Sequence, residues 1–186
     1  MGSLNFASQA VPLGRLWCRR LWWEGNRCFS PSRPLVLRPI PVHVRSLLRW
    51  WLHPGVLDSS VPWCRPAPHL DVYTDASDIG WGYQASSGLQ GSGLWTHWDL
   101  EMHVNERELL VPLLFLRGHP HLRDLHICFH LDSMVAVHCI SMMGSSRAIR
   151  LQTLSEKIFH LASPKKVLLS AVHVPGVENV WADALS

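Results

Sequence analysis

Apolar and polar residues alternate from residue 69 onwards, whereas no such order is visible before it. The alternation covers His69–Asp75, Gly80–Ala85 and Leu89–Thr96. Ser77-Asp78 and Gly88 separate these segments, and such residues are typical of tight turns. A period of two residues puts successive side chains on opposite faces of a strand. This part of the chain is therefore predicted to form a three-stranded antiparallel meander.

Helical and strand patterns then follow one another. A helix is predicted over Asn105–Arg117, because Gly118-His119-Pro120 would end it. A strand over Leu125–Leu131 and a short helix over Ser133–Met142 come next. The first half of the folded region thus contains both element types.

An amphipathic helix, a strand and a final helix complete the pattern. The amphipathic helix follows Gly144-Ser145-Ser146, and its apolar side holds Ile149, Leu151, Leu154, Ile158 and Leu161. The strand is predicted over Val167–Val174, and the last helix begins near Glu178 or Asn179. The order βββαβααβα indicates an α/β fold, with a mixed sheet and helices packed on it.

Residues 1–68 differ in charge from the rest. They hold nine arginines against Glu24 and Asp58, a net charge of +7, while the remainder has eight basic and twelve acidic residues, a net charge of −4. Six of the ten Trp residues also lie here, and only Val42–Leu52 suggests a short helix. We predict a basic Trp-, Arg- and Pro-rich tether over residues 1–68 and one folded domain over residues 69–186.

Three roles fit this tether. Interleaved Arg and Trp side chains can neutralise phosphates and stack on bases. The Trp residues can instead pack against a neighbouring domain, or the segment can be a basic linker that contacts nothing. A basic arm on an acidic body is what a protein that handles polyanions would show.

The cysteines and the apolar segments favour a reduced, intracellular protein, cytoplasmic or nuclear. The five cysteines contain no Cys-x-x-Cys pair, so the sequence supports neither a disulfide framework nor a zinc knuckle. The longest apolar stretch, Leu109–Leu116, is interrupted by Pro112 and is too short to span a bilayer. No signal peptide is visible at the amino terminus. We therefore expect no membrane partner.

Four carboxylates are the strongest sign of chemistry. Asp75 closes the first predicted strand, Asp132 closes the fourth, and Asp183 lies in the first turns of the last helix, while Glu108 lies one turn into the first helix. Open α/β sheets hold their sites where strands end and helices begin. Carboxylates gathered in one cleft repel one another unless cations hold them. This arrangement points to a metal-dependent phosphodiesterase.

Structural explanations compete with this one. Glu108 could complete a capping box with Asn105, Asp132 could cap the following helix, and Asp183 could favour a helix amino end. Glu106 is the fallback ligand, on a different helix face.

Another group has the residue types of a zinc site. His126, Cys128 and His130 share one strand face, but simple alternation explains that spacing as an ordinary strand face.

The flanking motifs make the chain similar to a known family. It resembles the ribonuclease H domain of retroelement polyproteins, most closely that of DIRS-type elements, with the gypsy-type version as a near relative. Coverage runs from about residue 69 to 186, and residues 2–16 look like the segment that joins a reverse transcriptase to this domain. The motifs are Tyr73–Ser77 with Gly80–Gly82, Gly93–Trp95, His103–Asn105 before Glu108–Leu110, Leu131–Ser133, and His173–Ser186.

The resemblance implies a ribonuclease H-like fold and an enzyme that hydrolyses the RNA strand of RNA–DNA hybrids. It further implies a reverse transcriptase domain as partner and two Mg²⁺ ions, with Mn²⁺ as an alternative. Asp75 would bridge both ions, Asp183 would help hold the one that activates water, and Glu108 and Asp132 would hold the other. Asn105, Arg147 and the backbone around Trp81 are candidates for nucleic-acid contacts.

Two departures from the family pattern bear on activity. Pro112 falls inside the first helix, where its ring would clash with the Glu108 carbonyl and predicts a kink. The chain also stops at Ser186, which truncates the carboxy-terminal helix. The alternative function is therefore a catalytically decayed remnant that binds nucleic acid or a protein. A transposase or integrase nuclease is disfavoured, because such enzymes place their acids in another order.

Overall fold

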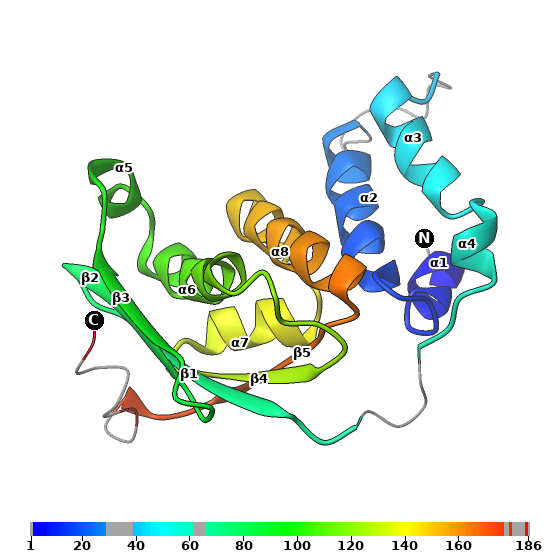
Figure 1. Ribbon diagram of the computed structural model, residues 1–186. Coiled ribbons are helices and arrows are strands. Elements are labelled where there is room, and N and C mark those ends of the chain that lie inside the picture. Colours follow the sequence, from blue (N-terminus) through cyan, green and yellow to red (C-terminus); the bar gives the residue numbers. More distant parts are fainter. Residues whose placement is uncertain (1, 29–38, 62–65, 177–178, 180–184, 186) are drawn as a thin grey trace.

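The computed structural model describes residues 2–28, 39–61, 66–176, 179 and 185 (Figure 1). Its elements follow the order of the chain. Four helices come first: α1 (Gly2–Ala7), α2 (Gly14–Cys28), α3 (Val42–Trp50) and α4 (Pro54–Leu57). The second part holds β1 (Leu70–Ala76), β2 (Gly80–Ala85), β3 (Gln90–Leu94), α5 (His97–Leu100), α6 (Val104–Gly118), β4 (His126–Leu131), α7 (Met134–Ser141), α8 (Ile149–Ala162), the 3₁₀ helix Ser163–Lys165 and β5 (Leu168–His173).

One mixed sheet organises the second part, in the strand order β3-β2-β1-β4-β5. β1, β2 and β3 pair antiparallel, as the meander prediction requires, and β4 and β5 add in parallel beside β1. Parallel neighbours need a crossover, which α6 supplies between β1 and β4 and α7 and α8 supply between β4 and β5. The three parallel strands therefore end at the same edge of the sheet.

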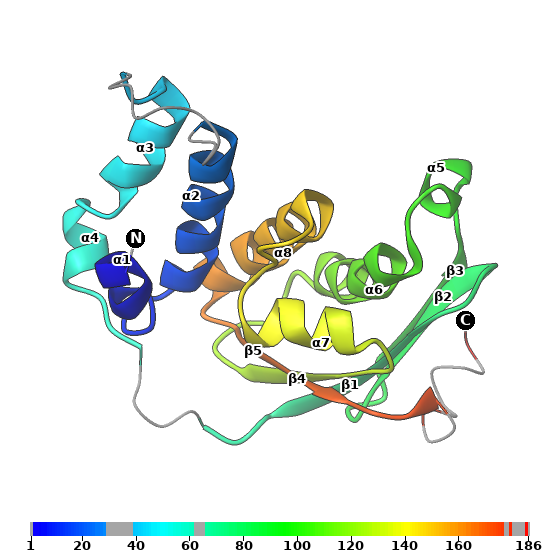
Figure 2. The same cartoon turned by 180° about the vertical axis from the view of Figure 1, so that it is seen from behind.

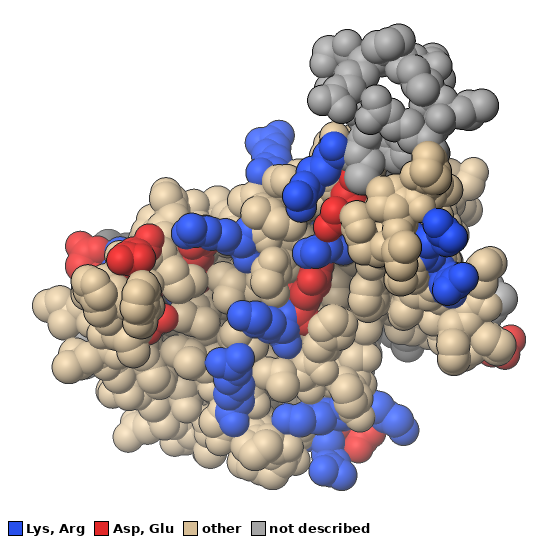
Figure 3. Space-filling model, turned by 90° about the horizontal axis from the view of Figure 1, so that it is seen from above, with Lys and Arg blue, Asp and Glu red and all other residues tan. Residues whose placement is uncertain are grey.

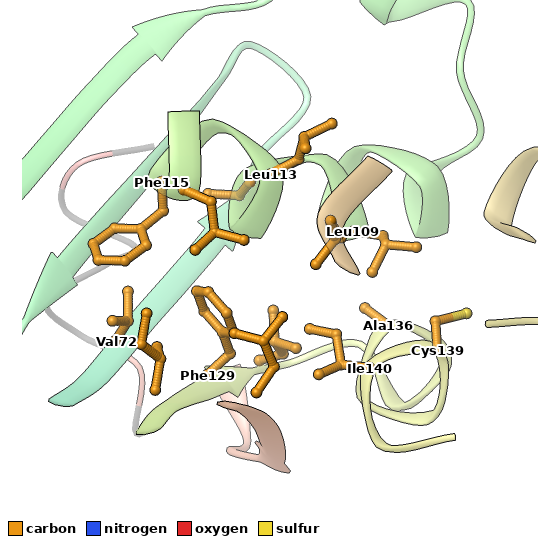
Figure 4. Close-up of a cluster of buried hydrophobic side chains, with 14 of the residues drawn as sticks. Val72, Leu109, Leu113, Phe115, Phe129, Ala136, Cys139 and Ile140 are labelled. Atoms are coloured by element: carbon orange, nitrogen blue, oxygen red, sulfur yellow. The ribbon is translucent and has the colours of Figure 1, made fainter. Parts of the chain in front are cut away.

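The helices of this part cover one face of the sheet (Figures 1 and 2). α6 lies between the sheet and α8, and it is buried on nearly every side, from Glu106 to Leu109 and from Val111 to Leu113. Figure 4 shows the resulting core, in which Phe115 and Leu113 of α6 face Phe129 of β4. Phe115 and Phe129 are 0% exposed and meet edge to face at 5.8 Å. This packing fixes α6, and with it Glu108, over the ends of β1 and β4.

The predicted α/β mixed sheet with helices packed on it is confirmed. The strand predicted over residues 80–85 coincides with β2, and the other strand and helix bounds differ by one or two residues at most ends. The short helix α5 was not predicted. It is stabilised by a capping box between Thr96 and Asp99. The predicted final helix lies outside the described residues.

Pro112 does not end α6, which runs unbroken from Val104 to Gly118. The ring removes the backbone hydrogen bond to the Glu108 carbonyl, and that loss usually destabilises a helix interior. Pro112 is buried, so tertiary packing compensates for the missing bond.

The amino-terminal part differs from the predicted tether, because most of its described residues are helical and α2 packs against α8. Leu16 of α2 is 1% exposed and belongs to the core. Gln152 of α8 is fully buried, donates its amide to the Leu16 carbonyl at 3.2 Å and accepts from the Ser145 amide at 3.0 Å. The sequence hid this contact because the partners lie 136 residues apart.

Aromatic contacts also join the two parts. The Trp17 ring lies 5.3 Å from Trp50 and 5.7 Å from His160 of α8. Part of the Trp surface in this segment therefore packs against the chain itself. The boundary at residue 68 and the likeness to a reverse transcriptase connection segment stay predictions.

Among the described residues, no helix is both long enough and apolar enough to cross a membrane.

Replacing Gln152 by Ala tests the docking of α2. The change leaves the Leu16 carbonyl and the Ser145 amide without their partner, so we expect a loss of about 2 to 4 kcal/mol in the free energy of unfolding. Urea denaturation measures this loss, and hydrogen exchange should become faster in α2. Thr153→Ala, at the neighbouring position, is the control and should change stability by no more than about 0.5 kcal/mol. Unchanged exchange in α2 would contradict the packing of this helix on the body.

Candidate active site

The pairing of β1 with β4 brings two of the four predicted carboxylates together. Thr74 lies opposite Leu131 in this parallel pair, so the next residues in register are Asp75 and Asp132. Neighbouring strands lie about 4.8 Å apart, and residues in register point to the same face. On the other side of Asp75, its partner in β2 is Gly82, which has no side chain to fill the space. Two carboxylates thus share an uncrowded end of the sheet.

Glu108 reaches the same place from α6. The helix begins one residue earlier than predicted, at Val104, and its N-cap is His103, whose ring accepts a hydrogen bond from the Asn105 amide. The capping-box explanation of Glu108 is therefore wrong. Its side chain is 7% exposed, and its Oε2 atom is buried with no hydrogen-bond partner among the described residues. A buried carboxylate oxygen without a partner is costly to the fold.

The pKa of Glu108 shows how closely the acids are gathered. It is raised from 4.5 to about 8, most by burial and then by the negative charges of Asp75 and Asp132. Arg107 opposes this effect weakly. The guanidinium of Arg107 donates instead to the Ser77 carbonyl at 3.1 Å and to the Asp78 carboxylate at 2.9 Å. Among the described residues, no cation is therefore paired with the carboxylate of Glu108.

Glu106, the fallback ligand, differs in this respect. Its carboxylate lies 3.6 Å from the guanidinium of Arg150. Glu106 thus has a protein cation beside it, whereas Glu108 has two more acids. This contrast favours Glu108 as the metal ligand.

Asp132 does not cap α7, because Ser133 does so by accepting from the Ala136 amide at 3.3 Å. The structural explanation offered for Asp132 is therefore wrong as well. Its side chain is half exposed, and one oxygen lies 3.6 Å from Nε2 of His173. The other oxygen faces Gly176, where an added Cβ would lie only 3.1 Å away. A side chain at position 176 would press on this carboxylate, so the glycine keeps it accessible.

Asn179 ties the segment after β5 to the site. It is 1% exposed, and its amide donates to the Thr74 carbonyl at 2.9 Å, one residue before Asp75. Asp183, four residues further on, lies outside the described residues. Its part in the site stays a prediction.

The three predicted nucleic-acid contacts are not gathered at one place. Asn105 lies at the edge of the site, because its side-chain oxygen accepts from the Ser133 hydroxyl at 3.4 Å. Trp81 stacks on Tyr83 and covers Gly93 on β3, so it has a packing function of its own. Arg147 lies exposed in the loop after α7, at the end of that helix opposite to Asp132. Only Asn105 adjoins the carboxylates.

The donor set fits hard divalent cations. Asp75, Glu108 and Asp132 offer carboxylate oxygens, which Mg²⁺ prefers, from three elements that the core holds fixed. The unpartnered Oε2 of Glu108 has the chemistry of an atom that coordinates a cation. His173, Gly176 and Asn179 support this site, although sequence reasoning assigns none of them a role in it. Their only signal was their place in the motif before Asp183.

No protein-family model matches the chain, and no curated protein matches it significantly. Solved structures do match. The N-terminal RNase H domain of rv2228c from Mycobacterium tuberculosis is 17% identical, with a TM-score of 0.51 over 63% of this chain and 89% of that one.

Two further structures show similar coverage. RNase H1 from Halobacterium salinarum is 20% identical, with a TM-score of 0.49 over 62% of this chain and 92% of that one. LC11-RNase H1, solved in complex with an RNA/DNA hybrid, is 21% identical, with a TM-score of 0.46 over 62% of this chain and 92% of that one. Identities this low bear on the fold alone. Together with the strand order β3-β2-β1-β4-β5, the match to the M. tuberculosis domain shows that this chain has the ribonuclease H-like fold.

Proposed function

We propose that this chain is a metal-dependent endonuclease that hydrolyses the RNA strand of RNA–DNA hybrids, as part of a retroelement reverse transcriptase. The fold alone does not give this activity, since one fold hosts many functions. The proposal is supported by the carboxylates and by the motifs that flank them.

One observation carries the proposal. Glu108 is buried beside Asp75 and Asp132, and one of its oxygens has no partner among the described residues. Without a cation, burial and like charges favour a protonated, inert Glu108. With divalent cations bound, the same three carboxylates would be ligands at the end of β1 and β4. The burial of Glu108 beside two further carboxylates therefore favours a metal site over a purely structural cluster.

Each acid has a separate task in this proposal. Asp75 would be a ligand of both Mg²⁺ ions, and Glu108 and Asp132 would hold the ion that stabilises the leaving oxygen. Asp183 would help to hold the ion that activates the attacking water. When bound, the two ions activate that water and neutralise charge on the departing oxygen. His173, 3.6 Å from Asp132, orients that carboxylate.

The face of the molecule that the helices form carries basic side chains that would attract a duplex substrate. Figure 3 shows Lys and Arg side chains spread across the face that the helices form. Such charges attract phosphates and offset the repulsion that an acidic site alone would exert on a nucleic acid. In this proposal Asn105, whose side chain accepts from Ser133 beside the carboxylates, would contact a 2′-hydroxyl next to the scissile phosphate.

Asp75→Asn tests the activity directly. The change keeps the shape of the side chain but removes a ligand charge, so we expect cleavage of a labelled RNA–DNA hybrid with Mg²⁺ to fall at least about a hundredfold, since the metal contributes several kcal/mol to the transition state. Removing Mg²⁺ with a chelator should have the same effect on the parent chain.

Asp124→Asn is the matched control for this experiment. Asp124 is exposed and has a positive φ of 54°, which Asn also adopts readily, so cleavage should stay unchanged. Salt-sensitive binding of the hybrid by the parent chain without any cleavage would instead support the decayed remnant.

Glu108→Gln tests the electrostatics of the metal-free protein. Because the pKa of Glu108 is raised from 4.5 to about 8, the folded state holds a proton that the unfolded state releases in this range. The parent chain should therefore lose stability as pH rises from 4.5 to 8, by at most about 5 kcal/mol at 1.36 kcal/mol per pKa unit. Thermal unfolding in a chelator measures the slope.

Glu108→Gln and a control variant show whether Glu108 causes the dependence of stability on pH. Glu108→Gln should remove the slope and also the stabilisation that Mg²⁺ gives at pH 8. Glu101→Gln changes an exposed carboxylate and should leave both unchanged. An identical slope in Glu108→Gln would show that another group titrates.

A further inference from the structure

A second cluster of ligand-type side chains lies on the same two strands as the carboxylate site. Asp71 of β1 is in register with Cys128 of β4, and His130 follows two residues later on the same face of β4. One potential ligand atom from each residue lies within 4.8 Å of the other two. The oxygen Oδ1 of Asp71 lies 2.8 Å from Nε2 of His130.

From this geometry we propose that Asp71, Cys128 and His130 bind one Zn²⁺ ion. Thiolate, imidazole and carboxylate are the three ligand types that Zn²⁺ takes from proteins. A zinc ion with bonds of about 2.0 to 2.3 Å needs its ligand atoms about 3.4 Å apart. The three side chains reach that spacing by shifts of about 1 Å, and the Cys128 thiol gives up its proton to solvent on binding.

The sequence pattern alone offered a different trio, with His126 in place of Asp71, and alternation explained that trio as an ordinary strand face. The structure excludes His126, because both of its ring nitrogens are engaged. Nδ1 lies 2.8 Å from the Pro66 carbonyl, and Nε2 lies 2.8 Å from the Ser170 hydroxyl. Asp71 takes the place of His126 because strand pairing sets it beside Cys128. Residue spacing within one strand contains no information about this pairing.

The surroundings also suit a metal ion. The Tyr73 ring stacks on His130 at 4.3 Å and 17°, which holds the imidazole in one plane. The Asp71 side chain is 42% exposed, so an ion can enter from solvent. In Figures 1 and 2 the labelled helices lie on the other side of the sheet, and none of them covers this face. A bound ion keeps one position open for water.

This site differs chemically from the one that holds Asp75. Oxygen ligands alone select Mg²⁺, whereas a mixed sulfur, nitrogen and oxygen set selects Zn²⁺. The proposed ion would pin β1 to β4 just before the residues where both strands deliver their carboxylates. It would act as a structural clamp, and it does not depend on the nuclease activity.

Cobalt spectroscopy of the full chain tests the proposal. Co²⁺ replaces Zn²⁺ in such sites and gives a thiolate-to-cobalt charge-transfer band in the near ultraviolet. We expect this band to saturate at one Co²⁺ per chain, to persist in excess Mg²⁺, and to disappear when Zn²⁺ is added. Zn²⁺ at one hundred times its dissociation constant should raise the melting temperature by about 5 to 10 °C.

Matched variants identify the ligands. Cys128→Ser should abolish the band, while Cys139→Ser, at another buried cysteine, should retain it. His130→Gln should weaken Co²⁺ binding at least about tenfold, while His126→Gln on the same strand face should not. If Cys128→Ser does not fold, Asp71→Asn, at a side chain that is 42% exposed, gives a second test, because it should weaken Co²⁺ binding at least about tenfold.

Two results would overturn the proposal. One is a parent chain that shows no charge-transfer band, which would leave the cluster as an ordinary hydrogen-bonded group. The other is a band or an affinity that survives unchanged in Asp71→Asn and His130→Gln. Loss of hybrid cleavage in any variant is a separate readout and decides neither point.

Discussion

The parallel pairing of β1 with β4 is the contact on which the rest of the structure depends. Its register sets Asp75 beside Asp132 at the end of the sheet. The same pairing buries Val72 and Phe129 on the helix side, where α6 packs and carries Glu108 into place. A slip of one residue would turn each of these side chains to the other face. The core and the candidate site are therefore specified by one set of backbone hydrogen bonds.

The carboxylate site opposes the stability of this fold. Glu108 is held by a well-packed helix at a point where burial and two like charges disfavour its ionised form. A helix surrounded by apolar contacts can impose such a position, because the packing of Leu109 and Phe115 outweighs one unfavourable carboxylate. Unfavourable local electrostatics that the surroundings enforce are typical of functional sites. Elsewhere in the same helix, Glu106 is also buried, but the guanidinium of Arg150 lies 3.6 Å from its carboxylate.

Local sequence patterns predicted the strands and most of the helices of the second part of the chain, whereas they contained no information about contacts between distant segments. Alternation predicted β1 and β2 closely, and the Asp75 and Asp132 motifs lie at strand ends as expected. The N-cap of α6 was misplaced, because His103 accepts the amide hydrogen bond in place of Asn105. The tether prediction does not anticipate α2, because the short apolar stripe of this helix is interrupted by Arg19 and Arg20 and packs against α8, which is distant in sequence.

The sequence by itself determined the order of elements and the mixed sheet, and it named the four candidate acids, because periodicity, turn residues and short motifs act over a few positions. Only the tertiary structure decided which groups meet. Tertiary packing raises the pKa of Glu108 and places Gly176 against Asp132. Strand pairing brings Asp71, and not His126, into one cluster of ligand-type side chains with Cys128 and His130. The physical reason is that burial, charge and ligand geometry depend on distances between residues that are dozens of positions apart, and strand pairing and helix packing together set those distances.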